Sequence, residues 1–359
     1  MPTRPNGKPF EFLSFDELRR LKDHEFLIPG LLPTECVAML FGPSGAYKTF
    51  VALSLLLSIA TGTPWMQGTR VKRSTVMYVF GEGGAGLKKR AQAWFLHHNK
   101  VGAYANVTFH KGAVNLFDKA EVLAFIEAVQ EQQAANRSHC RRRTRAPLRV
   151  IAFDTLARCM VGAEENSNSE MSKVMDHCDM IRDQLGVTVL LVHHTGKTDS
   201  NEPRGASAMR GAMDSLVLAD RPGRRQKFKA IVSVSKMKDD EEPEPMAVKL
   251  EPVDLPNGQT SLVAVYDGVV TNGPANDNET LSPNQQAIYD IVVAAGVQGI
   301  AWPDVRAQAR SNGIGGNRSS ALAEYRNALL KKALIVEQDG RLYAAEHAAG
   351  DHGAETGTG

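Results

Sequence analysis

The stretch VAMLFGPSGAYKTFVALSLLL, residues 37–57, decides the fold of this chain. Its middle eight residues lie between an apolar run typical of a buried strand and an apolar run typical of a helix. Successive backbone N–H groups at the start of such a helix form a concave site for an anion. This order of strand, loop and helix therefore predicts a phosphate-binding P-loop. The residues of the loop are Gly42, Pro43, Ser44, Gly45, Ala46, Tyr47, Lys48 and Thr49.

The last residues of the P-loop indicate ATP and Mg²⁺ as its ligands. Lys48 is expected to reach the β- and γ-phosphates of ATP, and the Thr49 hydroxyl to take one coordination position of Mg²⁺. Tyr47 stands where a glycine usually precedes the lysine, which is a departure from the motif. The alternative is an ordinary turn between a strand and a helix, with the lysine and threonine on the surface.

Length and composition are those of a globular protein. The chain has 359 residues, which predicts two domains, and 43% of them are hydrophobic and 23% charged. No run approaches the ~18–20 apolar residues of a membrane span, and residues 1–12 lack the apolar core of a signal peptide. The four cysteines form no CxxC pair, so neither a zinc site nor a disulfide framework is expected. We therefore expect a cytoplasmic protein without a membrane partner.

Apolar runs alternate with helical patterns up to about residue 213, which predicts an α/β fold with a mostly parallel sheet. The near-continuous apolarity of the runs predicts strands buried on both faces. Shorter strands beyond this point predict an antiparallel extension of the same sheet. The strands are expected at 36–41, 75–81, 148–154, 187–193, 215–219, 229–235, 246–251 and 261–267. The helices are expected at 48–62, 85–99, 118–133 and 168–185.

Composition also divides the chain into domains. Residues 1–30 are expected to form a lead-in and residues 31–267 the α/β domain. Residues 268–280 are rich in Gly, Asn and Thr, which predicts a linker. A small second domain is expected over 281–346, and the small, polar residues 347–359 are predicted to be disordered.

Two acidic residues complete the predicted nucleotide site. Asp154 ends the apolar run 148–154 in the form of a Walker B strand, and its carboxylate is expected to hold Mg²⁺ through the water shell of the metal. Glu82 follows the strand 75–81 and is expected beside the end of the P-loop strand, where it polarises the attacking water. The alternatives are a helix cap for Asp154 and a solvated acid in a glycine turn for Glu82.

Polar and basic residues follow the fourth strand of the predicted sheet. His194 is expected to contact the γ-phosphate region and sense its presence, with a structural role as the alternative. Lys197, Arg204 and Arg210 lie in or beside the polar loop after it, which is suited to ordering by nucleotide or nucleic acid. A separate basic cluster is a candidate for nucleic-acid phosphates or a solvated loop. Its members are Arg137, Arg141, Arg142, Arg143 and Arg145.

Five segments in this order resemble the RecA-fold ATPases of the RepA-type hexameric replication helicases of plasmids and phages. They are GPSGAYKT (42–49), VMYVFGEGGAG (76–86), VIAFDTL (150–156), LVHHTGK (191–197) and RGASAMRG (204–211). The likeness spans about residues 12–267 and includes the lead-in EFLIPGLLP (25–33). It implies a RecA-like core and a ring of identical subunits, with a hexamer expected and ATP bound between neighbours. Tyr47 resembles a variant within this family.

The resemblance also implies that a cation of the neighbouring subunit completes each site, as an arginine finger does. Lys236 and Lys238 resemble the strand-borne basic pair that such helicases insert in trans, with Arg210 and Arg204 as rivals. Exposed lysines on an edge strand are the alternative. Single-stranded DNA and other replication proteins are the partners that the resemblance implies.

The C-terminal module, residues 283–345, combines three helical segments with a strand, an Asp-Gly turn and a second strand. It resembles a winged helix, whose recognition helix enters a DNA groove. Asn317 to Ser320 open the expected recognition helix, and Arg318 is the candidate for a DNA phosphate contact. A protein contact is the alternative, because the module carries no strongly basic face.

Three functional hypotheses share hydrolysis of ATP to ADP and phosphate. The leading one is a ring-forming DNA motor or helicase-like replication protein of a plasmid or phage. The second is an ATP-switched DNA-binding regulator or loader that does not unwind DNA. The third is a filament-forming recombination ATPase, which shares the core fold.

Overall fold

The structure is a computed structural model of the chain. It describes residues 12–20, 25–81, 83–139, 146–195, 203, 207–221, 227–238, 240–270, 281–314, 320–331 and 334–345. The chain divides into two compact units, residues 1–271 and 272–359.

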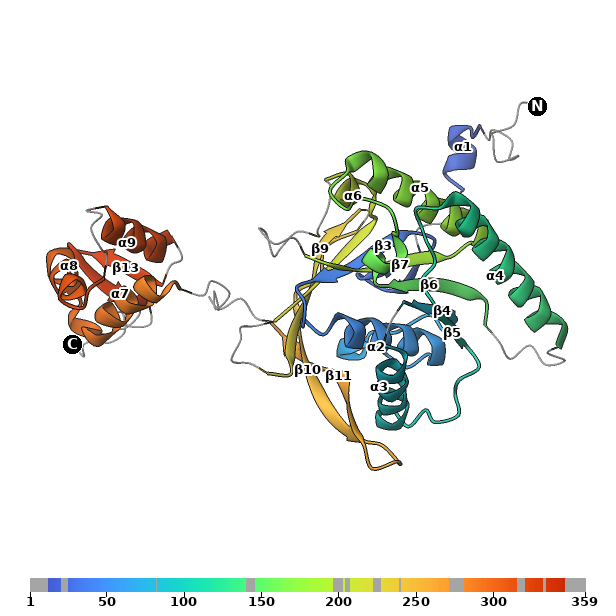
Figure 1. The fold of residues 1–359 in the computed structure, drawn as a ribbon, viewed down its shortest axis with the longest axis horizontal. Coiled ribbons are helices and arrows are strands. Elements are labelled where there is room, and N and C mark those ends of the chain that lie inside the picture. Colours follow the sequence, from blue (N-terminus) through green and yellow to red (C-terminus); the bar gives the residue numbers. More distant parts are fainter. Residues whose placement is uncertain are drawn as a thin grey trace, which may run out of the picture. The chain divides into compact units, whose positions relative to one another are not determined.

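A single sheet organises the described part of the first unit, with nine strands in the order β11-β10-β9-β8-β3-β7-β6-β4-β5 (Figure 1). The strands from β8 to β5 pair in parallel, and β9, β10 and β11 continue the sheet in antiparallel pairs. The predicted mostly parallel sheet with an antiparallel extension is therefore confirmed, with one correction: the strand expected at 215–219 pairs in parallel with β3, so the extension begins one strand later, at β9. The bounds are β3 (Val37–Gly42), β4 (Thr75–Phe80), β5 (Val107–Lys111), β6 (Leu148–Asp154), β7 (Thr188–His194), β8 (Ser215–Asp220), β9 (Lys229–Met237), β10 (Met246–Asp254) and β11 (Thr260–Val269).

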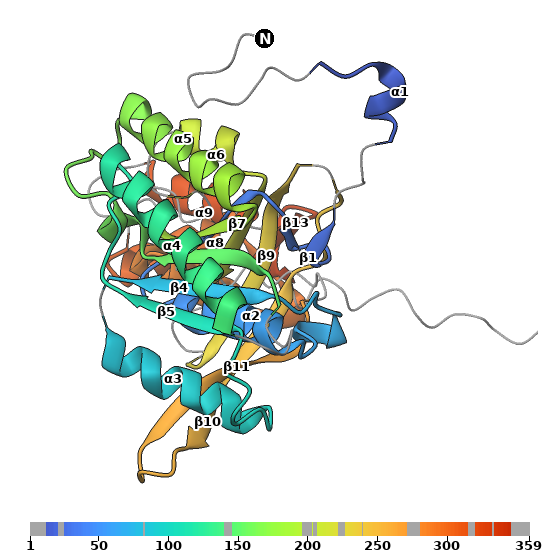
Figure 2. The ribbon, with the colours of Figure 1, turned by 90° about the vertical axis from the view of Figure 1, so that its right-hand side faces the viewer.

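Helices cover both faces of this sheet (Figures 1 and 2). The helices α2 (Lys48–Thr61) and α3 (Gly84–His97) pack into one apolar cluster, and α4 (Lys119–His139) and α5 (Asn168–Leu185) into another on the opposite face. Every residue of β3 is buried, which confirms the expectation drawn from its apolarity. The shorter elements are α1 (Phe15–Leu18), α6 (Ser207–Ala212) and the 3₁₀ turns η1 (Met66–Gly68) and η2 (Leu156–Cys159).

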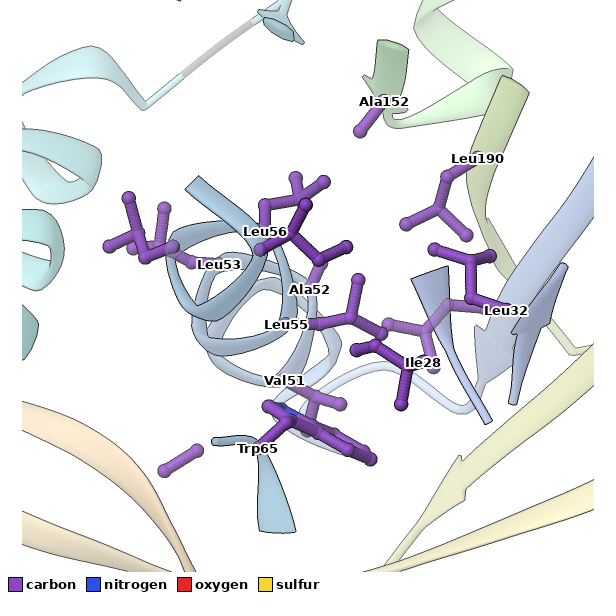
Figure 3. Packing of buried hydrophobic residues seen from close by; sticks show 14 of the residues in the cluster. Ile28, Leu32, Val51, Ala52, Leu53, Leu55, Leu56, Trp65, Ala152 and Leu190 are labelled. Carbon is purple, nitrogen blue, oxygen red and sulfur yellow. The ribbon is translucent and has the colours of Figure 1, made fainter. Parts of the chain in front are cut away.

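The helix α2 is buried on nearly all sides, because it packs against strands of the sheet and against α3, with a short lead-in hairpin beside it. This hairpin pairs β1 (Phe26–Ile28) with β2 (Leu32–Pro33) in antiparallel fashion. Figure 3 shows Leu55 of α2 pointing toward Ile28, and Val51 beside Trp65. Packing on several sides fixes the first turn of α2, and with it the loop that precedes the helix.

The order of strands corrects one expectation. Two strands, β7 and β6, lie between β3 and β4, so the strand that precedes Glu82 is not the neighbour of the P-loop strand. An apolar pattern reveals a strand but not its place in the sheet, because that place depends on the crossovers. Glu82 itself lies outside the described residues.

Two further features of the large sheet escaped the sequence patterns. The strand β5 was not predicted, since VTFHK is short and its residues are half-buried or exposed at the sheet edge. The strand β11 ends at Val269, two residues beyond the boundary expected at 267.

The second unit has its own apolar core, formed by residues such as Ile288, Val292, Leu329 and Leu342. Its described elements are α7 (Pro283–Ala294), η3 (Gly296–Gln298), β12 (Ile300–Ala301), α8 (Trp302–Ser311), α9 (Ala321–Lys331), β13 (Ile335–Gln338) and β14 (Arg341–Ala344). The three strands form an antiparallel sheet in the order β12-β14-β13. The expected sequence of helix, strand, Asp-Gly turn and strand is present at the end of this unit. Among the helices that the structure describes in either unit, none has both the length and the apolarity needed to cross a membrane.

Deleting residues 272–359 is expected to leave the first unit folded, because each unit buries its own apolar core. The shortened chain should unfold in one cooperative transition and bind ATP as tightly as the full chain does. Thermal unfolding and nucleotide titration of the two proteins, side by side, measure this. A shortened chain that is insoluble or lacks a thermal transition would show that the two units depend on each other.

Candidate functional site

The predicted P-loop connects β3 to α2, and its glycines are required by its geometry. A Cβ on Gly42 would lie 1.9 Å from the carbonyl oxygen of Ala219 in β8, so no larger residue fits there. Gly45 has φ = 81°, in the left-handed region that favours glycine. The loop is closed by the Ala46 N–H, which donates to the Pro43 carbonyl at 3.2 Å.

Tyr47 also adopts a left-handed conformation, with φ = 61°, at the residue that caps α2. This conformation explains why glycine is usual here, since a side chain adds strain. Three contacts hold the tyrosine in place. Its hydroxyl accepts a hydrogen bond from the Phe228 N–H at 3.2 Å, its ring packs edge-on against Phe50, and the guanidinium of Arg221 lies 5.6 Å from the ring centroid. The favourable packing offsets the backbone strain and makes the departure from the motif tolerable.

The amine of Lys48 lies inside the loop. It donates to the carbonyls of Gly42 at 2.8 Å and Pro43 at 2.9 Å, and it lies 3.2 Å from Nδ1 of His194. Burial lowers the pKa of Lys48 to about 8, although the negative charge of Asp154 opposes this shift. The amine is therefore mostly protonated at pH 7. It is held beside the expected phosphate position, which the backbone N–H groups of the loop surround.

The carboxylate of Asp154 lies beside the P-loop threonine. Its Oδ2 accepts hydrogen bonds from the Thr49 hydroxyl at 2.9 Å and from the Tyr78 hydroxyl at 2.6 Å. Burial, with the nearby charge of Asp154, raises the pKa of Tyr78, so the phenol stays a neutral donor. A hydroxyl and a carboxylate are oxygen ligands of the type that Mg²⁺ prefers, so Thr49 and Asp154 fit this ion.

These groups face one cavity of about 610 Å³, a size typical of small-molecule sites. It brings together the P-loop, the ends of β4, β6 and β7, and the first turns of α3. The lining residues are Gly45, Tyr47, Lys48, Thr49, Phe50, Tyr78, Phe80, Gly83, Gly86, Leu87, Arg90, Asp154, Thr155 and His194. Lys48, Thr49, Asp154 and His194, predicted from separate motifs, thus lie together.

Three of the basic residues expected to act in trans, Lys236, Lys238 and Arg210, are described by the structure and lie elsewhere. In β9, Lys236 pairs with Leu216 near the start of β8, whereas the P-loop follows the end of the parallel strand β3. The Lys236 amine donates to the Arg210 carbonyl at 2.7 Å, and the Lys238 amine lies 3.5 Å from a carboxylate oxygen of Asp214. These cations do not line the cavity of their own chain.

Several predicted residues cannot be placed by the structure. Glu82, Lys197, Arg204 and Arg318 lie outside the described residues. The same holds for Arg141, Arg142, Arg143 and Arg145, and for the side chain of Arg137.

Among the cavity residues that the motif analysis missed, Tyr78 and Arg90 carry polar groups that bear on the chemistry of the site. A tyrosine within the apolar run of β4 was a weak signal, because a buried phenol needs a partner for its hydroxyl. That partner, Asp154, can be recognised only from the pairing of the strands. Tyr78 of β4 lies opposite Ala152 of β6, and Asp154 follows two residues later on β6. Arg90 lies one helical turn after Gly86 in the glycine-rich start of α3. The sequence shows this spacing, but it does not show that this helix face lies near the P-loop.

A phosphate loop, a neighbouring strand-end aspartate and a shared cavity together define a P-loop site for a nucleoside triphosphate. Residues 7–200 match the family model of the AAA domain, which covers more than half of the chain. The chain therefore belongs to this family of P-loop ATPases, and membership supports an ATP-hydrolysing function. No curated protein matches the chain.

ATP affinity is expected to fall as the pH rises above about 8, because the Lys48 amine then loses the proton that gives it charge. The pKa of Lys48 lies below its usual value of 10.5, so the loss begins earlier than for an exposed lysine. Titration with ATP and Mg²⁺ at pH 7, 8 and 9 measures the effect, which should approach roughly tenfold per pH unit before levelling off. A Lys48→Arg variant that still binds ATP should show a flatter profile, since arginine stays protonated. An equal slope for both proteins would contradict this assignment.

Proposed function

We propose that this chain is an ATP-hydrolysing, ring-forming motor that acts on DNA, of the kind found in RepA-type replication helicases. The observation that carries the proposal is the single cavity that joins Lys48, Thr49, Asp154 and His194. A RecA-like core is consistent with the sheet order, in which β7 separates the P-loop strand from the strand of Asp154. A cytoplasmic location, single-stranded DNA and other replication proteins as partners belong to the same proposal.

The residues predicted from motifs have defined tasks in the proposed hydrolysis of ATP. When ATP binds, Lys48 would leave the carbonyls of Gly42 and Pro43 and bind the β- and γ-phosphates, and Mg²⁺ would be held by Thr49 directly and by Asp154 through its water shell. The bound Mg²⁺ supplies neutralisation of the phosphate charge. Glu82, the sequence-based candidate, accepts a proton from the attacking water while the bond between Pγ and the bridging oxygen of ADP breaks.

His194 is suited to report whether the γ-phosphate is present. Its Nδ1 lies 3.2 Å from the Lys48 amine, so a phosphate that draws the amine away changes the surroundings of the imidazole. Because His194 ends β7, this change occurs at the start of the polar loop that holds Lys197 and Arg204. The loop is the proposed contact with single-stranded DNA, where such residues track phosphates with little base specificity.

The ring is supported by the placement of the remaining cations. Lys236, Lys238 and Arg210 gather at the end of β8 and β9 that is remote from their own P-loop. A neighbouring copy in a ring offers them a second nucleotide site, which they complete in trans as an arginine finger does. A hexamer is the proposed assembly.

The second unit supports a winged-helix proposal. Its order of helix, strand, two helices and two strands, with a three-stranded antiparallel sheet, is compatible with a winged helix, although the strand β12 was not predicted. Arg326 of α9 is bonded to Glu337 and its guanidinium lies 5.2 Å from the Trp302 ring centroid, so it is held in the unit. Contact with DNA phosphates is therefore assigned to Arg318, and a protein contact stays the alternative for this unit.

The experiment that tests the function combines ATPase rates with strand separation. We expect the full chain to hydrolyse ATP with Mg²⁺, faster with single-stranded DNA, to form a closed ring by mass measurement, and to unwind a forked duplex. Hydrolysis on DNA without strand separation would instead support the regulator or loader. Open helical polymers on single-stranded DNA would support the recombination ATPase, and absence of any ATP binding would overturn all three.

A further inference from the structure

One arginine of the cavity has no task in the function proposed above. Arg90 of α3 lines the same cavity as Lys48, Thr49 and Asp154. In the described part of the chain, its guanidinium makes no hydrogen bond or ion pair. Its contact is a cation–π interaction with Phe50, with 4.5 Å from Cζ to the ring centroid.

The helix α3 presents this arginine to the cavity through its spacing. Gly83, Gly86 and Arg90 recur at intervals of three and four residues, so they share one face of the helix, and all three line the cavity. A Cβ on Gly86 would lie 3.8 Å from Nη2 of Arg90, which places the guanidinium over a surface without side chains. The long side chain of Arg90 therefore has room to change its rotamer.

The cavity that Arg90 lines also contains the oxygens proposed to bind the metal, those of Thr49 and Asp154. The Tyr78 phenol lines the same cavity as Arg90, whose positive charge opposes the rise that burial and Asp154 produce in the pKa of Tyr78. The Tyr78 hydroxyl donates to Asp154, which is bonded in turn to Thr49. The γ-phosphate of bound ATP is expected near the oxygens of Thr49 and Asp154.

The charges of the cavity do not by themselves neutralise bound ATP unless Arg90 contributes. Among the described residues that line it, Lys48 and Arg90 are the cations and Asp154 is the anion. The charge of Lys48 alone does no more than balance Asp154, whereas ATP with one Mg²⁺ still carries net negative charge. A guanidinium is suited to this ligand, because its planar set of N–H groups matches two phosphate oxygens at once.

We propose that Arg90 is a γ-phosphate-binding residue in cis, which rests on the Phe50 ring without nucleotide and turns onto the γ-phosphate when ATP binds. The inference rests on the proposed ATP-binding function, and it explains how the site would discriminate between ATP and ADP. ADP lacks the phosphate that Arg90 reaches, so this arginine stabilises the ATP complex much more than the ADP complex. Each subunit can then distinguish ATP from ADP with its own Arg90, without a cation from the neighbouring subunit.

The test compares the affinities of the full chain for a non-hydrolysable ATP analogue, AMP-PNP, and for ADP, each with Mg²⁺. Arg90→Ala should weaken AMP-PNP binding about tenfold or more, since it removes charged hydrogen bonds, and ADP binding less than about threefold. Lys88→Ala is the matched control, because it removes one positive charge from an exposed position on the same helix. It should leave both affinities unchanged.

Three results overturn the inference: an equal loss for both nucleotides, no loss for either, or the same loss in Lys88→Ala. Arg90→Lys provides a second measurement if Arg90→Ala does not fold, since it keeps the charge but loses the paired contact. It should weaken AMP-PNP binding by an intermediate factor and leave ADP unaffected, and an unchanged AMP-PNP affinity would count against the proposal. Failure of the wild-type chain to bind either nucleotide is a different result, which overturns the proposed function itself.

Discussion

Replacement of Lys48 by alanine is expected to abolish measurable ATP binding, with a loss of at least about 100-fold in affinity. The buried amine is the cation that the P-loop itself contributes, and it already lies within the loop between two carbonyls. Its removal takes away the contacts to the β- and γ-phosphates, and no other described cation of the P-loop replaces them. Isothermal titration with ATP and Mg²⁺ measures the loss.

The control for this variant is Lys88→Ala, which removes a lysine from an exposed part of α3. Thermal unfolding of both variants should match the wild type, so that the lost affinity is not caused by unfolding. If Lys48→Ala bound ATP as the wild type does, the P-loop assignment would be wrong and with it the proposed function.

Replacement of Asp154 by asparagine is expected to slow ATP hydrolysis by about 100-fold or more while the fold is retained. The amide has the shape of the carboxylate but lacks the charge that attracts Mg²⁺. Its oxygen has two lone pairs, so it can still accept from both hydroxyls that bond to Oδ2, those of Thr49 and Tyr78. The Mg²⁺ concentration for half-maximal turnover should rise together with the loss of rate.

A steady-state assay at increasing Mg²⁺ tests this expectation. Asp304→Asn, an exposed change in the second unit, serves as the control and should hydrolyse ATP at the wild-type rate. An Asp154→Asn variant with normal turnover and normal Mg²⁺ dependence would show that this carboxylate does not position the metal.

Much of the fold of the first unit could be predicted, because its strands and helices carry strong periodic signals. The limits of β6 and α5 agree with the predicted ranges 148–154 and 168–185, since apolar runs and caps mark their ends. The order of strands could not be predicted in the same way. Parallel neighbours are joined by crossovers, so the nearness of two strand ends is a property of the whole sheet.

The candidate site was predictable where a motif names both residue and role, as for Lys48 and Thr49. It was not predictable where a contact depends on register between strands. The bond between Tyr78 and Asp154 forms because β4 and β6 pair in one particular register, which no local pattern reveals. Likewise, the cation of α3 became a candidate only when the cavity placed Arg90 opposite the P-loop.

The tyrosine in the P-loop has a mechanical consequence. Its hydroxyl holds the backbone of Phe228, and the strand that starts at the next residue carries Lys236 near its far end. The hydrogen bond of a single phenol thus connects the P-loop to the start of β9. In the proposed ring, a shift of Tyr47 on nucleotide binding is expected to pass through this hydrogen bond and along β9 toward the lysine that is proposed to serve the neighbouring site.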